Sequence, residues 1–143
     1  MSNKFGNVTY CPPDGDDIEN PDVELIRNIV LYENEGYWKQ GSGESGIEIQ
    51  GVNEQLIFFN YQDRGVFIML SPDYEVPVVS STNNKVQETL VHHIGGNEFR
   101  FPDCCLFPKA DAWTIIQNFI VSGMKTEKFQ WVELYDLDFE HGF

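Results

Sequence analysis

The sequence predicts an α+β domain in which two main helices pack on one face of an antiparallel β-sheet meander. Two segments carry apolar residues at helical spacing, and the short apolar runs between them are separated by turns of only a few residues. Connections this short join antiparallel neighbours. The length of 143 residues suits one domain spanning residues 1–143.

The N-terminal part predicts a strand, an acidic loop and the first helix. The strand is expected over residues 4–10 and the loop over residues 11–17. Asn20 is the expected N-cap, with Pro21 at the first helical position and Asp22 in the first turn. The buried stripe of this helix is expected to be Leu25, Ile26, Ile29 and Val30. The helix should fade over residues 33–36.

The middle of the chain predicts the meander. A flexible connector over residues 41–46 precedes strands over 47–51, 55–61 and 65–70, with turns at 53–54 and 62–65. A turn at 71–74 leads to a fourth strand over 75–80. After a break at 81–84, a strand over 86–94 and a short extended piece over 99–101 are expected.

The C-terminal part predicts the second helix and a closing strand. Pro108 opens the helix and Gly123 ends it in a left-handed cap. Its apolar stripe is Ala112, Ile115, Ile116, Phe119 and Ile120. Residues 129–139 then alternate, with Trp131, Tyr135, Leu137 and Phe139 at one parity and Asp136, Asp138 and Glu140 at the other. We expect a strand with an acidic outer face.

The charge balance excludes two classes of partner. Nine Lys and Arg stand against 23 Asp and Glu, giving a net charge of −14. Such a surface repels phosphate backbones and anionic membranes, so we expect no direct nucleic-acid binding and no membrane binding. The N-terminus has no apolar run typical of a signal peptide, and no stretch approaches the roughly 20 apolar residues of a membrane span. The expected location is cytoplasmic.

Cysteine and histidine supply the only residues that invite a catalytic interpretation. Cys104 and Cys105 form either a redox pair or, as we prefer, two small hydrophobic residues near a strand end. His92 and His93 would point to opposite faces of a strand, so they cannot share a metal there. A nucleophilic pair between one of these cysteines and one of these histidines stays open as an alternative. We predict no catalytic residue, no cofactor and no metal.

The acidic residues cluster near both ends of the chain. The first cluster is Asp14, Asp16, Asp17, Glu19, Asp22 and Glu24. The second is Glu133, Asp136, Asp138 and Glu140. One interpretation is a solvated surface that maintains solubility. The other is a surface that steers a basic partner toward this protein.

The order of features resembles immunity protein family one of bacterial polymorphic toxin systems. A Pro-started helix at 21–26 precedes the meander. The most specific matches are Phe107-Pro108-Lys109-Ala110-Asp111-Ala112-Trp113, Ile116-Gln117-Asn118-Phe119, Ser122-Gly123 and Trp131. The resemblance covers roughly residues 20–134, and its specific part lies within 107–131. Met124-Lys125-Thr126 departs from it, because the family usually has Arg-Pro soon after the glycine.

The resemblance implies an immunity protein, or antitoxin, rather than an enzyme. Such a protein is a monomer that forms a 1:1 heterodimer with its cognate toxin, a basic deaminase or nuclease, and occludes its active site. The zinc deaminase signature is absent from this chain, so it is not the toxin itself. Gly123 and Trp131 match the family motif with structural roles. A small enzyme using Cys or His chemistry and a general interaction scaffold are the alternatives.

Two rival patches are candidates for binding the toxin. The turns at 51–54 and 71–75 should meet at one end of the meander, because one strand pair separates them. The first patch therefore comprises Asn53, Glu54, Asp73, Tyr74 and Glu75. The second is the acidic strand face of Asp136, Asp138 and Glu140.

Overall fold

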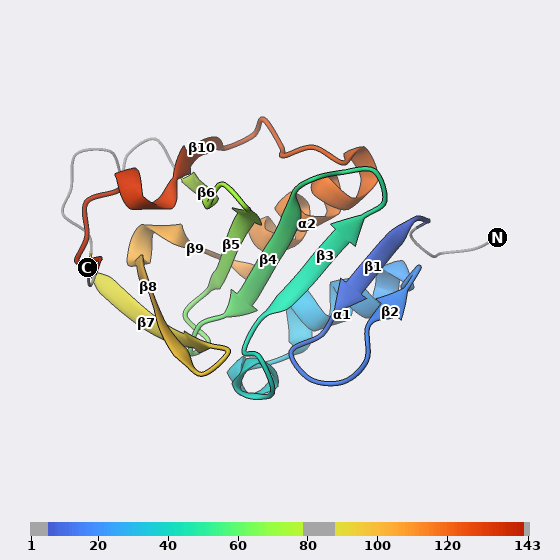
Figure 1. The fold of residues 1–143 in the computed structure, drawn as a ribbon, viewed down its shortest axis with the longest axis horizontal. Coiled ribbons are helices and arrows are strands. Elements are labelled where there is room, and N and C mark those ends of the chain that lie inside the picture. Colours follow the sequence, from blue (N-terminus) through green and yellow to red (C-terminus); the bar gives the residue numbers. More distant parts are fainter. Residues whose placement is uncertain (1–5, 79–87, 142–143) are drawn as a thin grey trace.

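The computed structural model of the chain describes residues 6–78 and 88–141 (Figure 1). Within these residues, eight strands form one antiparallel sheet with the order β10-β6-β5-β4-β3-β1-β2, and β9 pairs with β5 outside this path. The strands are β1 (Val8–Cys11), β2 (Ile18–Glu19), β3 (Ser45–Ile49), β4 (Gln55–Asn60), β5 (Val66–Ser71), β6 (Glu75–Val78), β9 (Leu106–Phe107) and β10 (Gln130–Glu133). The expected meander is confirmed in β3, β4, β5 and β6, which pair in chain order.

Two α-helices cover one face of this sheet, as the sequence predicted. In Figure 1, α1 (Val23–Tyr32) and α2 (Lys109–Ser122) both pass behind the strands, and they contact each other. Short 3₁₀ helices join the elements of the described part of the chain, namely η1 (Glu35–Lys39), η3 (Asp103–Cys105) and η4 (Leu134–Asp136). The two helices and the sheet form the two main layers of an α+β domain.

The two faces of the sheet differ in burial because side chains alternate along each strand. On the helix side, Tyr10, Ile47, Leu56, Phe58 and Ile68 are fully buried. The residues that alternate with them, such as Thr9, Glu48 and Gln55, point to the front face and keep contact with solvent. Antiparallel sheets commonly bury one face and leave the other in contact with water.

A hydroxyl cluster fixes η1 to the buried face. Trp38 Nε1 donates to Ser45 Oγ over 3.0 Å, and Ser45 Oγ lies 2.8 Å from the Tyr10 hydroxyl. The Tyr10 hydroxyl in turn lies 2.8 Å from that of Tyr37. Each buried polar group is thereby hydrogen-bonded, which removes the cost of burying it. This segment precedes β3, so the cluster positions the start of the meander.

A separate hairpin covers the lower part of the front face. Its strands are β7 (Thr89–Ile94) and β8 (Asn97–Pro102). The His92 ring stacks on Phe59 with centroids 3.9 Å apart, and its Nε2 donates to the Gly43 carbonyl over 2.7 Å. Phe101 packs against Phe67 at 4.8 Å. The hairpin therefore leaves the upper front face uncovered.

The predicted start of the first helix is wrong by two residues. The N-cap is Asp22, and the helix begins at Val23. Asn20 instead adopts a positive φ of 48° and accepts a hydrogen bond from the Asn7 amide through its side chain. The reason is the two-residue strand β2, which the sequence did not reveal and which Asn20 closes against β1. Leu25, expected in the core, is 36% exposed.

The predicted closing strand over 129–139 is also wrong in extent. Strand β10 ends at Glu133, and the chain turns into η4. The Leu134 amide donates to the Tyr74 carbonyl over 2.8 Å, and the Leu134 side chain is fully buried. Leu134 therefore points into the core, although its position has the parity that was expected to face solvent. The predicted alternation ends there. Asp136, Asp138 and Glu140 therefore do not form a strand face, although all three are exposed.

The remaining boundaries differ more modestly. The first strand begins at Val8, and the predicted residues 4 and 5 lie outside the described part. The same holds for residues 79–80 of the predicted fourth strand, for the break at 81–84 and for residues 86–87 of the next strand. The connector at 41–46 is partly structured, because Ser45 and Gly46 belong to β3. Gly123 caps α2 with φ 73°, as expected.

Candidate partner-binding surface

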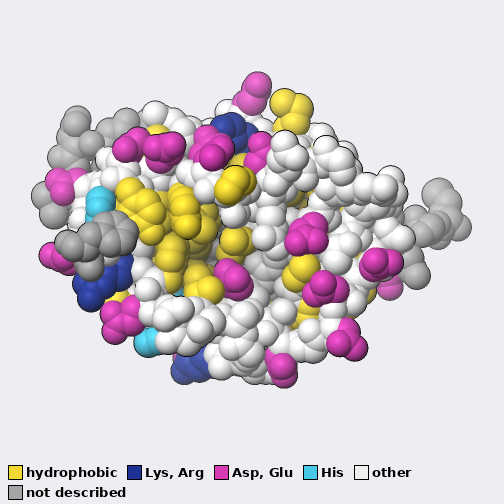
Figure 2. Space-filling view, in the orientation of Figure 1, with side chains coloured by type: hydrophobic (Ala, Val, Ile, Leu, Met, Phe, Trp, Pro, Cys, Tyr) yellow, Lys and Arg dark blue, Asp and Glu magenta, His cyan; other side chains and the backbone are white. Residues whose placement is uncertain are grey.

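The part of the front face that the hairpin leaves uncovered carries sheet side chains that face solvent, such as Glu19 and Glu48 (Figure 2). Figure 2 shows apolar side chains gathered left of its centre, with acidic side chains around them and across the right half. An apolar centre with a polar surround is the usual anatomy of a protein–protein interface. The residues of this surface come from several elements.

The predicted meeting of two turns is present at the upper end of the sheet. Gln55, which follows the turn at 51–54, pairs with Ser71, which precedes the turn at 72–75. Asn53 and Asp73 are exposed, and Glu54 is half-buried. The antiparallel pairing of β4 and β5 thus brings the first predicted patch together.

Tyr74 joins this patch to the second one. Its ring is 46% exposed and lies 5.7 Å from the ring of Tyr135, which is 37% exposed. Tyr135 lies in η4, one residue before Asp136 and close to Asp138 and Glu140. Burial and the nearby Tyr74 hydroxyl raise the pKa of Tyr135. The ring contact therefore joins the first predicted patch to the start of the segment that carries the second, while the Glu140 amide donates to Thr89 of β7 further along that segment. We call residues 51–54, 71–75 and 134–140 the rim.

The backbone of Tyr74 is strained. Its φ of 55° lies in the left-handed region, which bulky residues seldom occupy. The hydrogen bond from Leu134 to the Tyr74 carbonyl helps to hold this conformation. A strained residue with an exposed aromatic ring is a recognised mark of a functional position.

The charge of the rim is strongly negative but not uniform. Glu75 pairs with Lys125 over 2.7 Å, so this carboxylate is already compensated. Glu133 lies opposite Glu75 in the β6–β10 register and is exposed. Asp73, Asp136 and Asp138 add further exposed carboxylates. Of the first predicted patch, Asp73 and Tyr74 are therefore better placed than Glu75 to meet a partner.

A row of polar side chains crosses the front face beside the rim. Thr9 of β1 pairs with Glu19 of β2 on one side and with Glu48 of β3 on the other. Partners in register point to the same face, so the three side chains lie in one line. Gln55 and Ser71 pair with each other further along the same face. We call Glu19, Thr9, Glu48, Gln55 and Ser71 the polar row.

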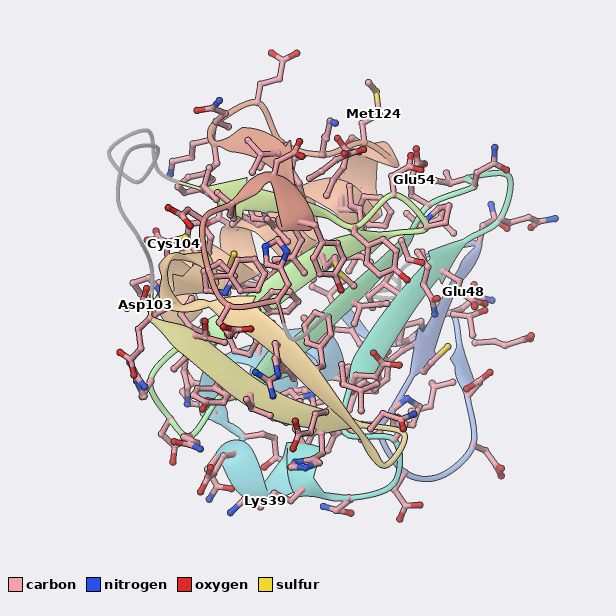
Figure 3. The ribbon with its side chains drawn as sticks, turned by 60° about the vertical axis from the view of Figure 1, so that its left-hand side comes forward. Lys39, Glu48, Glu54, Asp103, Cys104 and Met124 are labelled. Atoms are coloured by element: carbon pink, nitrogen blue, oxygen red, sulfur yellow. The ribbon has the colours of Figure 1, made fainter. Side chains whose placement is uncertain are left out.

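The polar row forms the floor of a hollow of about 680 Å³. All five members line it, and Asn53 and Glu54 of the rim line its upper wall. Figure 3 shows Glu48 on the face of the sheet and Glu54 above it. No Lys, Arg or His is among the described residues that line this hollow. The sequence alone does not reveal the row, because residue 19 meets residue 9 only through the β1–β2 pairing and residue 48 meets it only through the β1–β3 pairing.

An apolar edge next to the rim was missed as well. Met124 and Val121 are 69% and 73% exposed at the end of α2. A Cβ placed on Gly123 would lie 3.3 Å from Val52 Cγ2, so the end of α2 abuts the 51–54 turn. Met124 and Glu54 accordingly appear at the same end of the molecule in Figure 3. Exposed Met after a helical cap is a weak sequence signal, but it was available.

Of the two candidate nucleophiles, Cys105 lies in a setting that favours the neutral thiol, and so does Cys11, which was not a candidate. Cys105 is fully buried, and its hydrogen bond with Cys104 and its burial raise its pKa well above the usual value. Burial, and then Asp17 and Glu48, raise the pKa of Cys11 to about 12. A nucleophilic cysteine needs the opposite shift. The stacked His92 is half-buried and His93 is exposed, as predicted for neighbours on a strand.

Within residues 6–78 and 88–141, no group of three or more His, Cys, Asp or Glu side chains is arranged to hold a metal ion. The same residues contain no helix of the length and apolarity needed to cross a bilayer.

No family model matches the sequence, and no curated protein matches it.

Proposed function

We propose that this protein is an immunity protein that binds a cognate bacterial toxin and inhibits it by occluding its active site. The toxin is a basic, nucleic-acid-targeting deaminase or nuclease, and the complex is a 1:1 heterodimer in the cytoplasm. The proposal starts from the resemblance of residues 107–131 to immunity protein family one. The observation that carries it is the rim, where an exposed, strained Tyr74 stands among exposed carboxylates such as Asp73 and Asp136.

The physical argument concerns charge and anchoring. An enzyme that acts on nucleic acid presents a basic groove to its substrate, and a net charge of −14 draws such a groove toward this chain. Steering of this kind raises association rates and suppresses wrong partners. Tyr rings then supply contact area at low conformational cost, and they are frequent among the residues that dominate binding energy. Tyr74 and Tyr135 together provide such an anchor.

The enzyme alternative has less support. It requires an activated thiol, whereas the pKa values of Cys11 and Cys105 are raised. The scaffold alternative predicts several weak partners, and association that depends little on salt. Tight 1:1 binding that weakens steeply as salt is added would favour the immunity proposal over it.

The direct test uses the product of the neighbouring reading frame as the candidate toxin. Isothermal titration calorimetry would measure its affinity for the wild-type chain and for the variant Asp73→Asn/Tyr74→Ala/Glu75→Gln. We expect 1:1 binding that the triple variant weakens by more than about tenfold, because it removes the Tyr74 anchor and the exposed Asp73 carboxylate.

The matched control is Glu24→Gln/Tyr32→Ala/Glu33→Gln. It makes the same kinds of change at exposed residues in and directly after α1, which covers the other face of the sheet. The control should change the affinity by less than about twofold. Absence of binding by the wild-type chain would refute the proposal. Equal weakening by both variants would remove the rim as the binding surface.

A further inference from the structure

The polar row differs from the rim in its chemistry. Its members are two carboxylates, two hydroxyls and one amide, with no aromatic ring among them. Neighbouring strands lie about 4.8 Å apart, so Glu19 and Glu48, which flank Thr9, are held about 10 Å apart. Their backbones are fixed by the sheet ladder. The row is therefore a rigid, flat array rather than a flexible acidic loop.

The carboxylates of this face have no cation of their own. The ion pairs found among the described residues involve neither Glu19, nor Glu48, nor Glu54. The second hollow of the molecule, of about 540 Å³ at the lower end, is lined by Lys39, His92 and His93. Lys39 is itself paired with Glu35 in that lower hollow, whereas no Lys, Arg or His is among the described residues that line the hollow over the polar row.

Cys11 lies within the field of these carboxylates. It lies on the front face of β1, two residues from Thr9, and pairs with Gly46 in the register. Burial raises its pKa first, and the carboxylates of Asp17 and Glu48 raise it further. The negative potential of Glu48 thus reaches along the sheet beyond the row itself.

The Gln55 side chain leans over a glycine next to the polar row. A Cβ on Gly46 would lie 2.7 Å from Gln55 Nε2, so the Gln55 side chain lies over this glycine. Glu19 and Glu48 are themselves exposed, so an incoming chain can approach them from solvent.

We propose that the polar row receives a basic segment of a protein partner, with arginine or lysine side chains set against Glu48 and Glu19. Arginine fits best, since its planar guanidinium binds a carboxylate through two parallel hydrogen bonds. The Thr9 and Ser71 hydroxyls and the Gln55 amide accept or donate further bonds to that segment. The identification of the partner as the toxin rests on the proposed function, whereas the chemistry of the segment follows from the row.

The test uses a defined probe rather than the toxin. A capped pentapeptide with two arginines separated by one glycine is titrated into the ¹⁵N-labelled chain at low salt, and amide shifts are followed by NMR. We expect the largest shifts at Thr9, Glu19 and Glu48. The variant Glu19→Gln/Glu48→Gln should weaken the apparent affinity about fivefold or more, because each exposed pair contributes modestly.

The matched control is Glu24→Gln/Glu33→Gln, which removes two exposed carboxylates in and directly after α1. This control should change the affinity for the peptide by less than about twofold. Glu24 and Glu33 are too far from the polar row to interact strongly with a peptide bound there. Shifts spread evenly over the acidic surface, or equal weakening by both variants, would overturn the proposal. All four substitutions replace exposed side chains with isosteres, and circular dichroism would verify that the variants fold.

The two proposals can fail separately. A toxin that binds through Tyr74 and is insensitive to Glu19→Gln/Glu48→Gln would overturn the inference about the row and leave the immunity proposal standing. If the arginine peptide binds at the polar row but no toxin binds the chain, the immunity proposal fails and the inference about the row stands.

Discussion

The ring of Tyr74 lies 5.7 Å from the ring of Tyr135, although 60 residues of chain separate the two. The contact joins the turn between β5 and β6 to η4, and with them two acidic groups that are far apart in sequence. The hydrogen bond from Leu134 to the Tyr74 carbonyl reinforces it. A partner that meets one group therefore meets the other, which makes the rim large enough to act as a specific surface.

The strain at Tyr74 gives a first expectation. Because its φ of 55° suits glycine, Tyr74→Gly should be more stable than Tyr74→Ala by about 1 kcal/mol. Both variants lose the ring, so both should lose toxin affinity. Urea denaturation would measure the difference. Gln117, exposed within α2, is the inverse control, since Gly there should be less stable than Ala by about 1 kcal/mol. If the Gly variant were less stable than the Ala variant at both Tyr74 and Gln117, the backbone strain at Tyr74 would be contradicted.

His92 gives a pH dependence. Burial lowers its pKa from 6.5, so below that pH the unfolded chain binds more protons than the folded one. The contribution of His92 to the free energy of unfolding therefore falls as the pH drops through 6.5. Burial raises the pKa of Glu44 and gives that residue the opposite slope, so the comparison must be made between variants.

The variant His92→Phe keeps a flat ring against Phe59 and removes the titration. Its free energy of unfolding, followed from pH 7.5 to pH 5, should decline less than that of the wild-type chain. Gln117→Ala, at an exposed position of α2 that carries no titratable group, should retain the wild-type slope. Parallel curves for His92→Phe and the wild-type chain would show that His92 does not titrate in this way.

Gly43 ties the connector to the hairpin, and its replacement should be costly. A Cβ at this position would lie 2.2 Å from the His93 carbonyl oxygen, and the backbone adopts φ 86°. We expect Gly43→Ala to destabilise the protein by about 3 kcal/mol or more. At Gly95 the φ of 57° is also positive but no atom lies within 4 Å of the added Cβ, so Gly95→Ala should cost only about 1 kcal/mol. Thermal unfolding of both variants would verify this order, and equal costs would contradict the clash.

The rate at which Cys11 is alkylated depends on the electrostatic potential at the front face of the sheet. Its pKa of about 12 should slow alkylation by iodoacetamide at pH 8 roughly a thousandfold relative to a free cysteine. Site-resolved mass spectrometry would follow the rate. Glu48→Gln should accelerate alkylation of Cys11, because one of the carboxylates that raise its pKa is removed. Glu24→Gln serves as the control, and an equal rate in all three proteins would contradict the proposed field.

Much of the fold was predictable because it depends on local patterns. The apolar stripes of α1 and α2 and the cap at Gly123 depend on neighbours three or four residues away. The meander of β3, β4 and β5 depends on short turns, which leave little choice of pairing. Because β4 pairs with β5, the turns at 51–54 and 71–75 could also be predicted to meet.

The errors lie where distant segments compete with local pattern. The alternation over 129–139 favoured a strand, but Leu134 is drawn into the core and bonded to Tyr74. The Asn20-Pro21 pair favoured a helix start, but Asn20 closes the β1–β2 ladder. In both cases the deciding partner is more than ten residues away, and no local preference encodes it.

The sequence by itself determined the class of the fold, the net charge of −14 and the acidic character of both ends. Only the tertiary structure decided which acids lie together. It joined Tyr74 to Tyr135, and it aligned Glu19, Thr9 and Glu48 in one row across three strands. The physical reason is that strand register and docking are set by burial summed over the whole core, whereas helices and tight turns are set by residues within a few positions of one another.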